Sequence, residues 1–158
     1  MDPTSGYGTY ELCAGDCTGV VPSSLRRPLH LPHASGGACP VSKATGPVTP
    51  SPLAPLIAER FIGSSWLGAR VTWTASAAYR GPVLIRGRRL GGSAAVGFGE
   101  GRRPYDELQL RSAGQGAPPV SGGGRAWLSF TRVQSAGCYA YQIDGSGFSS
   151  VIVFKVPA

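Results

Sequence analysis

The sequence predicts an all-β protein: an antiparallel β-sandwich of about seven short strands, preceded by an extended, proline-rich N-terminal arm. Of the 158 residues, 24 are glycine and 14 are proline, which favours strands joined by turns over long helices. From Trp66 onward, apolar residues alternate with polar ones, as in half-buried strands. No segment reads as the long helix that a parallel crossover needs, so the strands should pair antiparallel. A small closed barrel is the alternative arrangement.

The chain divides in composition at residue 60. Residues 1–60 hold nine of the 14 prolines and only two aromatic residues. Proline fixes φ and lacks the backbone N–H, so this part cannot sustain helices, and we expect a largely irregular arm. The exception is residues 25–32, where Leu25, Leu29 and Leu31 are the candidates to anchor an extended strand. Residues 61–158 hold the other aromatic residues and form the predicted sandwich domain.

The first four predicted strands are one-sided. In residues 70–75 valine, tryptophan and alanine alternate with arginine and threonine, and residues 82–85 are a β-rich run behind a glycine. Residues 94–98 place three apolar side chains on one face, and residues 107–111 alternate leucine with charged and amide side chains. Each strand can therefore bury one face against a second sheet.

The last three predicted strands cover residues 125–133, 137–143 and 151–156. The first follows a glycine-rich turn, and the last is apolar on both faces, which is typical of a central or covered strand. Tyr139 and Tyr141 share a face of the middle strand. We expect them to fill the core, and a stacking platform for sugars is the alternative.

The net charge of +7, from 15 Lys and Arg against 8 Asp and Glu, comes entirely from residues 61–158. No run approaches the about 18 apolar residues of a membrane span, so we expect no transmembrane segment. No basic and apolar leader opens this sequence, so we expect no signal peptide in it. The composition excludes a coiled coil, a helix bundle and a membrane protein.

Arginine is the most conspicuous candidate for binding. Arg86, Arg88 and Arg89 fall within four residues, and guanidinium groups bind carboxylate, phosphate or sulfate. The three residues are therefore a candidate anion-binding strip. The alternative, which we favour, is a solvated edge strand whose charges prevent edge-to-edge pairing. Nucleic acid is not the expected partner, because no aromatic residue is interleaved with these arginines.

Patterns for catalysis are missing from the sequence. Asp106 and Glu107 are adjacent, so on a strand they point to opposite faces and cannot act as a paired acid and base. The last histidine is His33, so the domain would have to take a histidine base from the arm. We expect no enzyme, no catalytic residues and no cofactor.

The four cysteines leave two readings open. Cys39 lies in the arm and Cys138 begins a predicted strand, so a bridge between them would fix the arm to the domain. It would require an oxidising compartment, and two buried free thiols are the alternative.

Cys13, Cys17, His30 and His33 have nearly the spacing of a two-Cys, two-His zinc finger. Prolines flank His30 and exclude the helix that such a finger needs, so we expect no metal site. The sequence leaves the pairing of Cys13 and Cys17 open.

Five segments carry a resemblance to a known group: RPLHLP at 27–32, ACPVS at 38–42, YRGPVLIRGRRL at 79–90, GCYAYQIDG at 137–145 and VIVF at 151–154. Together they resemble uncharacterised bacterial exported proteins, often lipoprotein-like, with an immunoglobulin-like β-sandwich domain. The resemblance implies an extracytoplasmic setting, secreted or lipid-anchored, and favours the Cys39–Cys138 disulfide. It implies no activity.

The expected function is that of a non-enzymatic, exported binding or structural module at a bacterial cell surface. A component of the cell envelope or an acidic polymer is the kind of partner expected. The alternative is an anion- or nucleic-acid-binding domain that uses the arginine strip.

Overall fold

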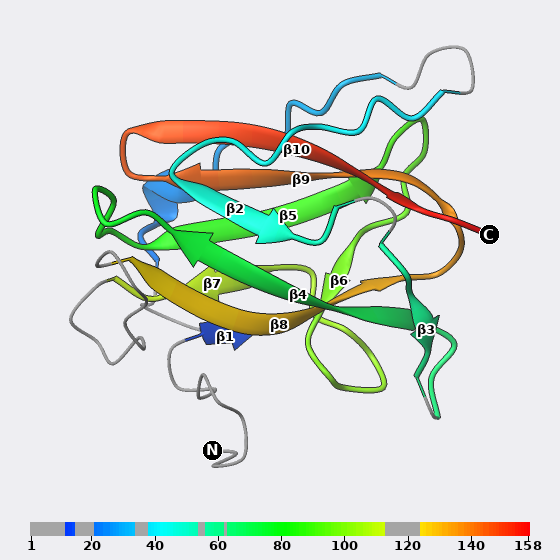
Figure 1. Cartoon of the computed structure of the whole chain (residues 1–158). Coiled ribbons are helices and arrows are strands. Elements are labelled where there is room, and N and C mark those ends of the chain that lie inside the picture. Colours follow the sequence, from blue (N-terminus) through cyan, green and yellow to red (C-terminus); the bar gives the residue numbers. More distant parts are fainter. Residues whose placement is uncertain (1–11, 15–20, 34–37, 54–55, 62, 113–123) are drawn as a thin grey trace.

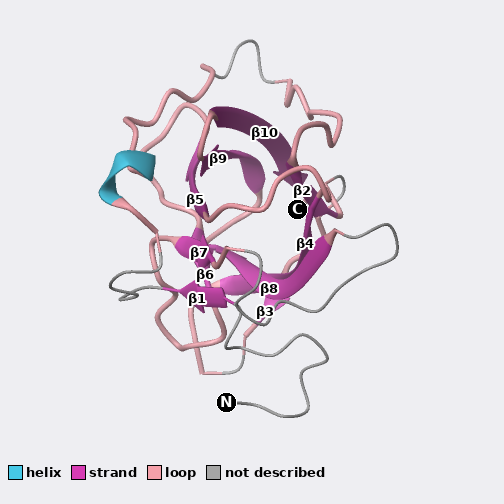
Figure 2. Ribbon diagram, turned by 90° about the vertical axis from the view of Figure 1, so that its left-hand side faces the viewer, coloured by secondary structure: helices cyan, strands magenta, loops and turns pink. Residues whose placement is uncertain are grey.

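Two antiparallel β-sheets face each other in the computed structural model, which describes residues 12–14, 21–33, 38–53, 56–61, 63–112 and 124–158 (Figure 1). Sheet 1 has the strand order β1-β7-β5-β9-β10, and sheet 2 has the order β2-β4-β8-β6, with β3 also paired to β4. Figure 2 shows the sheets as facing layers, with a short 3-10 helix outside β5 and β9. The prediction of an all-β chain with two antiparallel sheets is confirmed.

The strands of sheet 1 are β1 (Leu12–Ala14), β7 (Leu108–Leu110), β5 (Val83–Arg89), β9 (Gly137–Gly145) and β10 (Phe148–Val156). Those of sheet 2 are β2 (Val48–Ser51), β4 (Leu67–Ala75), β8 (Arg125–Val133) and β6 (Gly97–Phe98), with β3 (Glu59–Arg60) at the end of β4. The 3-10 helix η2 covers Ser23–Leu25.

All seven strands predicted in the domain are present, as β4 to β10. The strand predicted at residues 82–85 continues as β5 to Arg89, because Gly87 lets β5 pass close to its neighbours. A Cβ at Gly87 would lie 2.7 Å from the carbonyl oxygen of Ala140 and 2.9 Å from the side chain of Val96.

Three short strands, β1, β2 and β3, lie within the predicted arm of residues 1–60 and pair with strands of the domain. β2 forms a four-residue ladder with β4 although it contains Pro50, and proline is tolerated because β2 is an edge strand. Beyond β2 the chain crosses to sheet 1, where Lys155 of β10 donates its amide to Leu53 and accepts the amide of Leu56. Residues 48–53 and 56–60 therefore pack as part of the sandwich.

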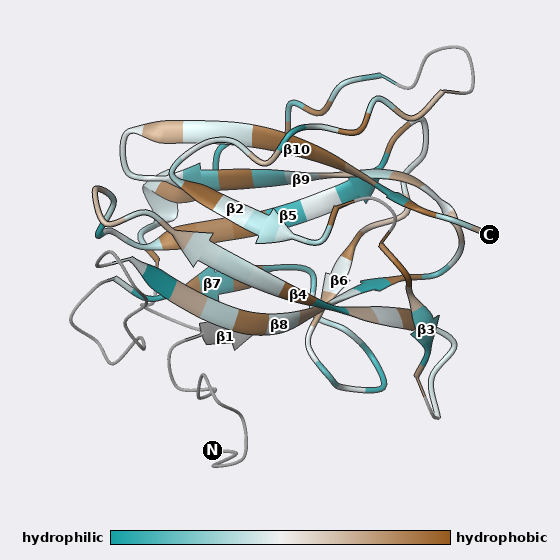
Figure 3. Ribbon diagram, viewed as in Figure 1, coloured by the Kyte–Doolittle hydropathy of each residue, from teal (hydrophilic) through white to brown (hydrophobic). Residues whose placement is uncertain are grey.

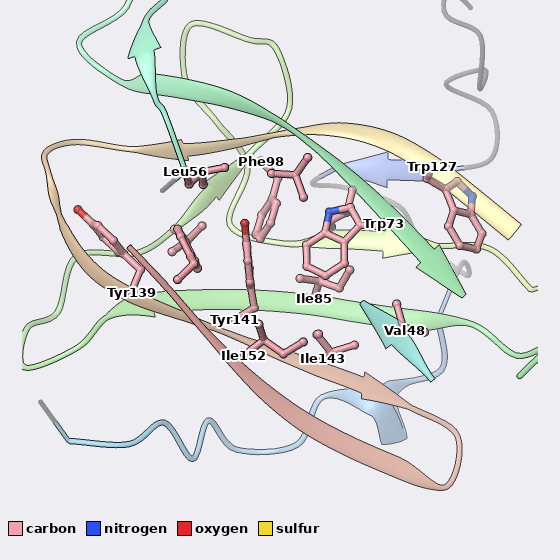
Figure 4. Packing of buried hydrophobic residues seen from close by; sticks show 14 of the residues in the cluster. Val48, Leu56, Trp73, Ile85, Phe98, Trp127, Tyr139, Tyr141, Ile143 and Ile152 are labelled. Atoms are coloured by element: carbon pink, nitrogen blue, oxygen red, sulfur yellow. The ribbon is translucent and has the colours of Figure 1, made fainter. Parts of the chain in front are cut away.

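The core lies between the sheets and is rich in aromatic rings (Figure 4). The ring of Tyr141 stacks on Phe154 at 4.3 Å and meets Trp73 edge-on at 4.9 Å. Its hydroxyl group is 2.7 Å from the hydroxyl of Thr131. Burial raises the pKa of Tyr141. Tyr139 is also buried, so the prediction that the tyrosines of β9 fill the core is confirmed.

The arm covers the outer face of sheet 1. Leu25 is buried, and Leu31 packs on a small apolar cluster formed by Leu90, Ala140 and Val153. The extended strand that these leucines predict is not present, because residues 26–33 form no strand. Figure 3 shows that the strand beneath, β5, is hydrophobic at its start and hydrophilic at its arginine-rich end. At this end of β5 the leucines of the arm have little apolar surface to pack on, so polar contacts are needed to hold the arm on sheet 1.

Candidate functional site

The structure places the three arginines of the predicted strip in three different environments. Arg86 points to the outer face of sheet 1, where its Nη2 donates to Asp144 Oδ2 at 2.9 Å and to the carbonyl of Arg27 at 2.6 Å. Arg89 lies at the far end of β5 and donates to Ser135 Oγ at 2.9 Å. Both guanidinium groups therefore donate hydrogen bonds within the protein, Arg86 to the arm and to β9 and Arg89 to the turn before β9.

Arg88 is the exposed member of the strip. It lines a shallow cavity of about 520 Å³ between the arm and the end of β5, together with Leu29, His33 and Arg89. Among the described residues its side chain has no hydrogen-bond partner. The structure does not bring the three guanidinium groups together on one surface, and anion binding by Arg86, Arg88 and Arg89 stays a prediction.

A buried carboxylate explains the position of Arg86. Asp144, at the end of β9, is completely buried and accepts hydrogen bonds at both oxygens. Arg27 Nη1 and Ser149 Oγ donate to Oδ1 at 3.2 and 2.6 Å, and Gln142 Nε2 donates to Oδ2 at 3.1 Å. One residue of this group comes from the arm and the other four come from sheet 1. We call the group the arm latch: Arg27, Arg86, Gln142, Asp144 and Ser149.

The arm latch also holds the backbone of the arm. Gln142 Oε1 accepts the amide of His30 at 2.8 Å, and its Nε2 donates to the carbonyl of Pro28 at 3.1 Å. Arg27 Nη2 donates to the carbonyl of Gly145 at 2.9 Å. The arm is therefore bonded to β9 through charged side chains and through its own peptide groups.

A second ion pair joins the arm to sheet 1 at a more open position. Arg26 forms a bidentate pair with Glu107, at 2.5 and 2.7 Å, and Gln109 also donates to this carboxylate. The hydrogen bonds from Arg26 lower the pKa of Glu107 despite its partial burial. Since the Arg26 side chain is 46% exposed, solvent screens the pair and its contribution to stability is small.

The pKa of Asp144 reflects two opposing effects. Burial raises it, but the hydrogen bonds from Ser149, Gln142 and the two arginines of the arm latch outweigh burial and lower it below its ordinary value. A carboxyl group whose pKa is lowered by folding stabilises the folded state above its unfolded pKa, and this stabilisation is lost as the pH falls through the folded pKa.

We therefore expect the free energy of unfolding to decrease as the pH falls below about 4, the ordinary range of carboxyl groups. Urea unfolding at pH 7 and at pH 3 measures the change. An Asp144→Asn variant has no carboxyl group to protonate at this position, so its free energy of unfolding should decrease less between pH 7 and pH 3. An equal decrease in both proteins would show that Asp144 is not the group responsible.

The arm is also joined covalently to the sheet. Cys39 and Cys138 form a disulfide with a Cα–Cα distance of 5.5 Å and a sequence separation of 99. Both cysteines pack against the apolar cluster on the outer face of sheet 1 that includes Leu31 and Val153. Of the two readings that the sequence left open, the structure has the Cys39–Cys138 bridge, which the resemblance favoured.

A second group of arginines, with aromatic rings among them, lies on and beside the outer face of sheet 2. The guanidinium of Arg132, which is fully buried, lies 3.9 Å from the ring centroid of Phe61. The guanidinium of Arg70 lies 6.0 Å from the ring centroid of Phe130. The rings of Phe61 and Phe130 meet edge-on. Burial lowers the pKa of Arg132. No acid pairs with Arg132 among the described residues, so its bonds go to backbone carbonyls and a hydroxyl.

Next to Arg132 lies a cavity of about 570 Å³, lined by the turn of residues 63–66 and by Arg102 and Arg103. We call Ser64, Trp66, Arg102 and Arg103 the end cluster, because they lie where β4 begins. Sequence reasoning missed this cluster, because its members come from two segments with no common motif. The only signal is the pair of adjacent arginines in a loop.

The predicted absence of a metal site concerns Cys13, Cys17, His30 and His33. The side chains of the two cysteines lie outside the described residues, so the finger spacing is not tested. Within the ranges that the structure describes, no group of three His, Cys, Asp or Glu side chains is placed to hold a metal ion. In the same ranges, no helix is long and apolar enough to cross a membrane.

Comparison of the chain with family models, curated proteins and solved structures gives no match.

Proposed function

We propose that this chain is a non-enzymatic, extracytoplasmic binding module with an immunoglobulin-like β-sandwich, working at a bacterial cell surface. The observation that carries the proposal is the Cys39–Cys138 disulfide, which fixes the arm on the outer face of sheet 1. Such bonds persist in oxidising compartments and are rare in the cytosol. A stapled arm gives a small domain the stability that an exported protein needs.

The strand order supports the immunoglobulin-like assignment. In a constant-type immunoglobulin domain, strands A to G form sheets in the orders A-B-E-D and C-F-G. Taken in chain order, β2, β4, β5, β6, β8, β9 and β10 correspond to A to G, and they form the orders β2-β4-β8-β6 and β5-β9-β10. β7 is then an addition beside β5, and β3 an addition beside β4.

Two details near β9 refine this assignment. The hydroxyl of Tyr139 donates to the carbonyl of Ser135 at 2.6 Å, a bond of the kind made by the tyrosine corner of immunoglobulin domains. The disulfide differs, because the immunoglobulin bond joins the two sheets through the core. Here Cys138 packs with Ala140 on the outer face of sheet 1 and is bonded to the arm.

The buried charged groups support a binding or structural role over catalysis. Asp144 is bonded by the arm latch, and Arg132 by backbone carbonyls. Arg125 donates to the carbonyls of Arg111 and Tyr79, both at 2.8 Å. These buried groups hold loops and the arm in place, which is a structural role.

The compartment is tested by the thiol state of the protein in its own host. Cells are treated with an alkylating agent at harvest, fractionated, and the protein is analysed by mass spectrometry. We expect Cys39 and Cys138 to be protected as a disulfide and the protein to lie outside the cytoplasmic fraction. Alkylation of both residues in the cytoplasmic fraction would contradict the proposal, with a known cytosolic thiol protein as the control for complete trapping.

A further inference from the structure

We propose that the cavity at the end cluster binds an acidic saccharide, with the carboxylate or sulfate on Arg102 and Arg103 and the sugar ring on Trp66. The cavity is shallow and open to solvent, and its volume of about 570 Å³ has room for a small ligand. The inference rests on the proposed role as a binding module, for which it names the site and the ligand class. It does not depend on the compartment.

The two segments that line the cavity are held together from below. Arg132 donates to Ser64 Oγ at 3.1 Å and to the carbonyls of Gly99 and Gly101 at 2.9 and 2.6 Å. Since Arg132 is fully buried, this bridge lies beneath the cavity and not in it. A buried arginine thus joins the turn before β4 to the loop after β6.

Further bonds fix the rim itself. Ser64 Oγ donates to the carbonyl of Arg102 at 2.6 Å and accepts the amide of Trp66 at 3.1 Å. Arg102 Nε donates to the carbonyl of Gly63 at 2.9 Å. A site whose supporting groups are already in place loses less entropy when a ligand binds.

The groups that face the ligand keep their donors available. In the part of the chain that the structure describes, Arg102 uses only Nε, and Arg103 makes no side-chain hydrogen bond; both residues are exposed. Their terminal nitrogens can form the paired hydrogen bonds that carboxylate and sulfate groups accept. The residues that line the cavity include two arginines and no acid, so the site favours an anion.

Trp66 supplies the second half of the recognition. It is half-buried, with part of its side chain in contact with solvent, whereas Trp73 and Trp127 are fully buried in the core. An indole ring offers a large apolar face, on which the C–H groups of a pyranose ring can pack. Trp66, Arg102 and Arg103 line the same cavity, and the combination of an indole with two guanidinium groups suits a charged sugar. Single-stranded nucleic acid is disfavoured, because it requires aromatic side chains for successive bases.

Fluorescence quenching tests the site directly. Acrylamide should quench Trp66 and leave the buried Trp73 and Trp127 largely unaffected. We expect heparin hexasaccharide and hexagalacturonate to protect Trp66 from acrylamide and maltohexaose to leave quenching unchanged. A Trp66→Phe variant should lose the quenchable signal.

Calorimetric titration with the same hexasaccharides measures the role of charge. Arg103→Ala should weaken binding about tenfold or more, the loss expected when charged hydrogen bonds are removed. The matched control is Arg80→Ala, which removes the same charge from an exposed residue beyond the opposite end of β4. It should change affinity by less than about twofold, because solvent and salt screen charges at that distance. Circular dichroism checks the fold of each variant.

Several results would overturn the inference. Equal losses in Arg103→Ala and Arg80→Ala would indicate diffuse attraction, and a loss only in Arg88→Ala would assign binding to the arginine strip. Binding of a thymidine decanucleotide or of inorganic sulfate as tight as that of the hexasaccharides would remove the saccharide assignment. No protection of Trp66 by any acidic hexasaccharide would refute the site. If Cys39 and Cys138 are alkylated in the cytoplasmic fraction but the hexasaccharides bind, the proposed extracytoplasmic location is wrong and the saccharide site stands.

Discussion

Reduction of the Cys39–Cys138 disulfide is expected to lower the melting temperature by about 8–20 °C. The bond closes a loop with a sequence separation of 99. In the chain-entropy model a loop of this length stabilises the folded state by about 4–5 kcal/mol, and each kcal/mol shifts the melting temperature of a chain of this size by about 2–4 °C. Thermal unfolding with and without reductant, followed by circular dichroism, measures the effect.

A double variant separates this bond from the other cysteines. Cys39→Ser with Cys138→Ser should melt at the temperature of the reduced protein, and reductant should lower it little further. If the oxidised and reduced proteins melt together, the disulfide contributes nothing and the stapled arm is not a stabilising element.

Replacing Asp144 should have the second large effect. In Asp144→Asn, the two arginines of the arm latch lose their only carboxylate partner among the described residues while they remain partly buried. Removing one partner of a buried ion pair costs about 3–5 kcal/mol, because the charge left behind is no longer compensated. Urea unfolding at pH 7 gives the change in the free energy of unfolding.

Asp106→Asn is the matched control, because Asp106 is exposed and should change stability by less than about 0.5 kcal/mol. A cycle with Arg86→Met tests the pairing. The double variant should lose less than the sum of the single losses, since removing Arg86 also removes one of the uncompensated charges. Additive losses, or an Asp144→Asn variant as stable as the natural protein, would show that the arm latch is not coupled.

Alternation of apolar and polar residues was sufficient to find the strands that bury one face. Trp73, for example, points into the core between outward-facing threonines, as its period of two predicts. β2 was missed because three prolines near it indicate irregular structure, whereas an edge strand accepts Pro50. Such a strand is defined by its partner and not by its own composition.

The fate of the arginines shows where sequence reasoning stops. Arg86 and Arg88 lie on one face of β5, so the local sequence pattern treats them alike. Only Arg86 lies within hydrogen-bond distance of Asp144, which is buried under the arm. The partner of Arg86 is 58 residues away in the sequence.

The end cluster was missed for the same reason. Trp66 and Arg103 come from different loops, and a buried arginine that belongs to a third segment, Arg132, holds those loops together. Contacts between distant segments depend on the pairing of whole strands, which one sequence does not reveal. The Cys39–Cys138 contact was one of two readings of the cysteines, and the resemblance rather than the spacing favoured it.

Hydrogen exchange at the amides of His30 and Ser42 in the oxidised protein tests most directly whether the arm covers sheet 1. The first donates to Gln142 Oε1 and the second to the carbonyl of Val153, so both report whether the arm lies on sheet 1. If the arm lies on sheet 1, both amides exchange much more slowly than in an unfolded chain. Exchange of both at the unfolded rate, with the strands still protected, would show that the arm does not cover the sheet.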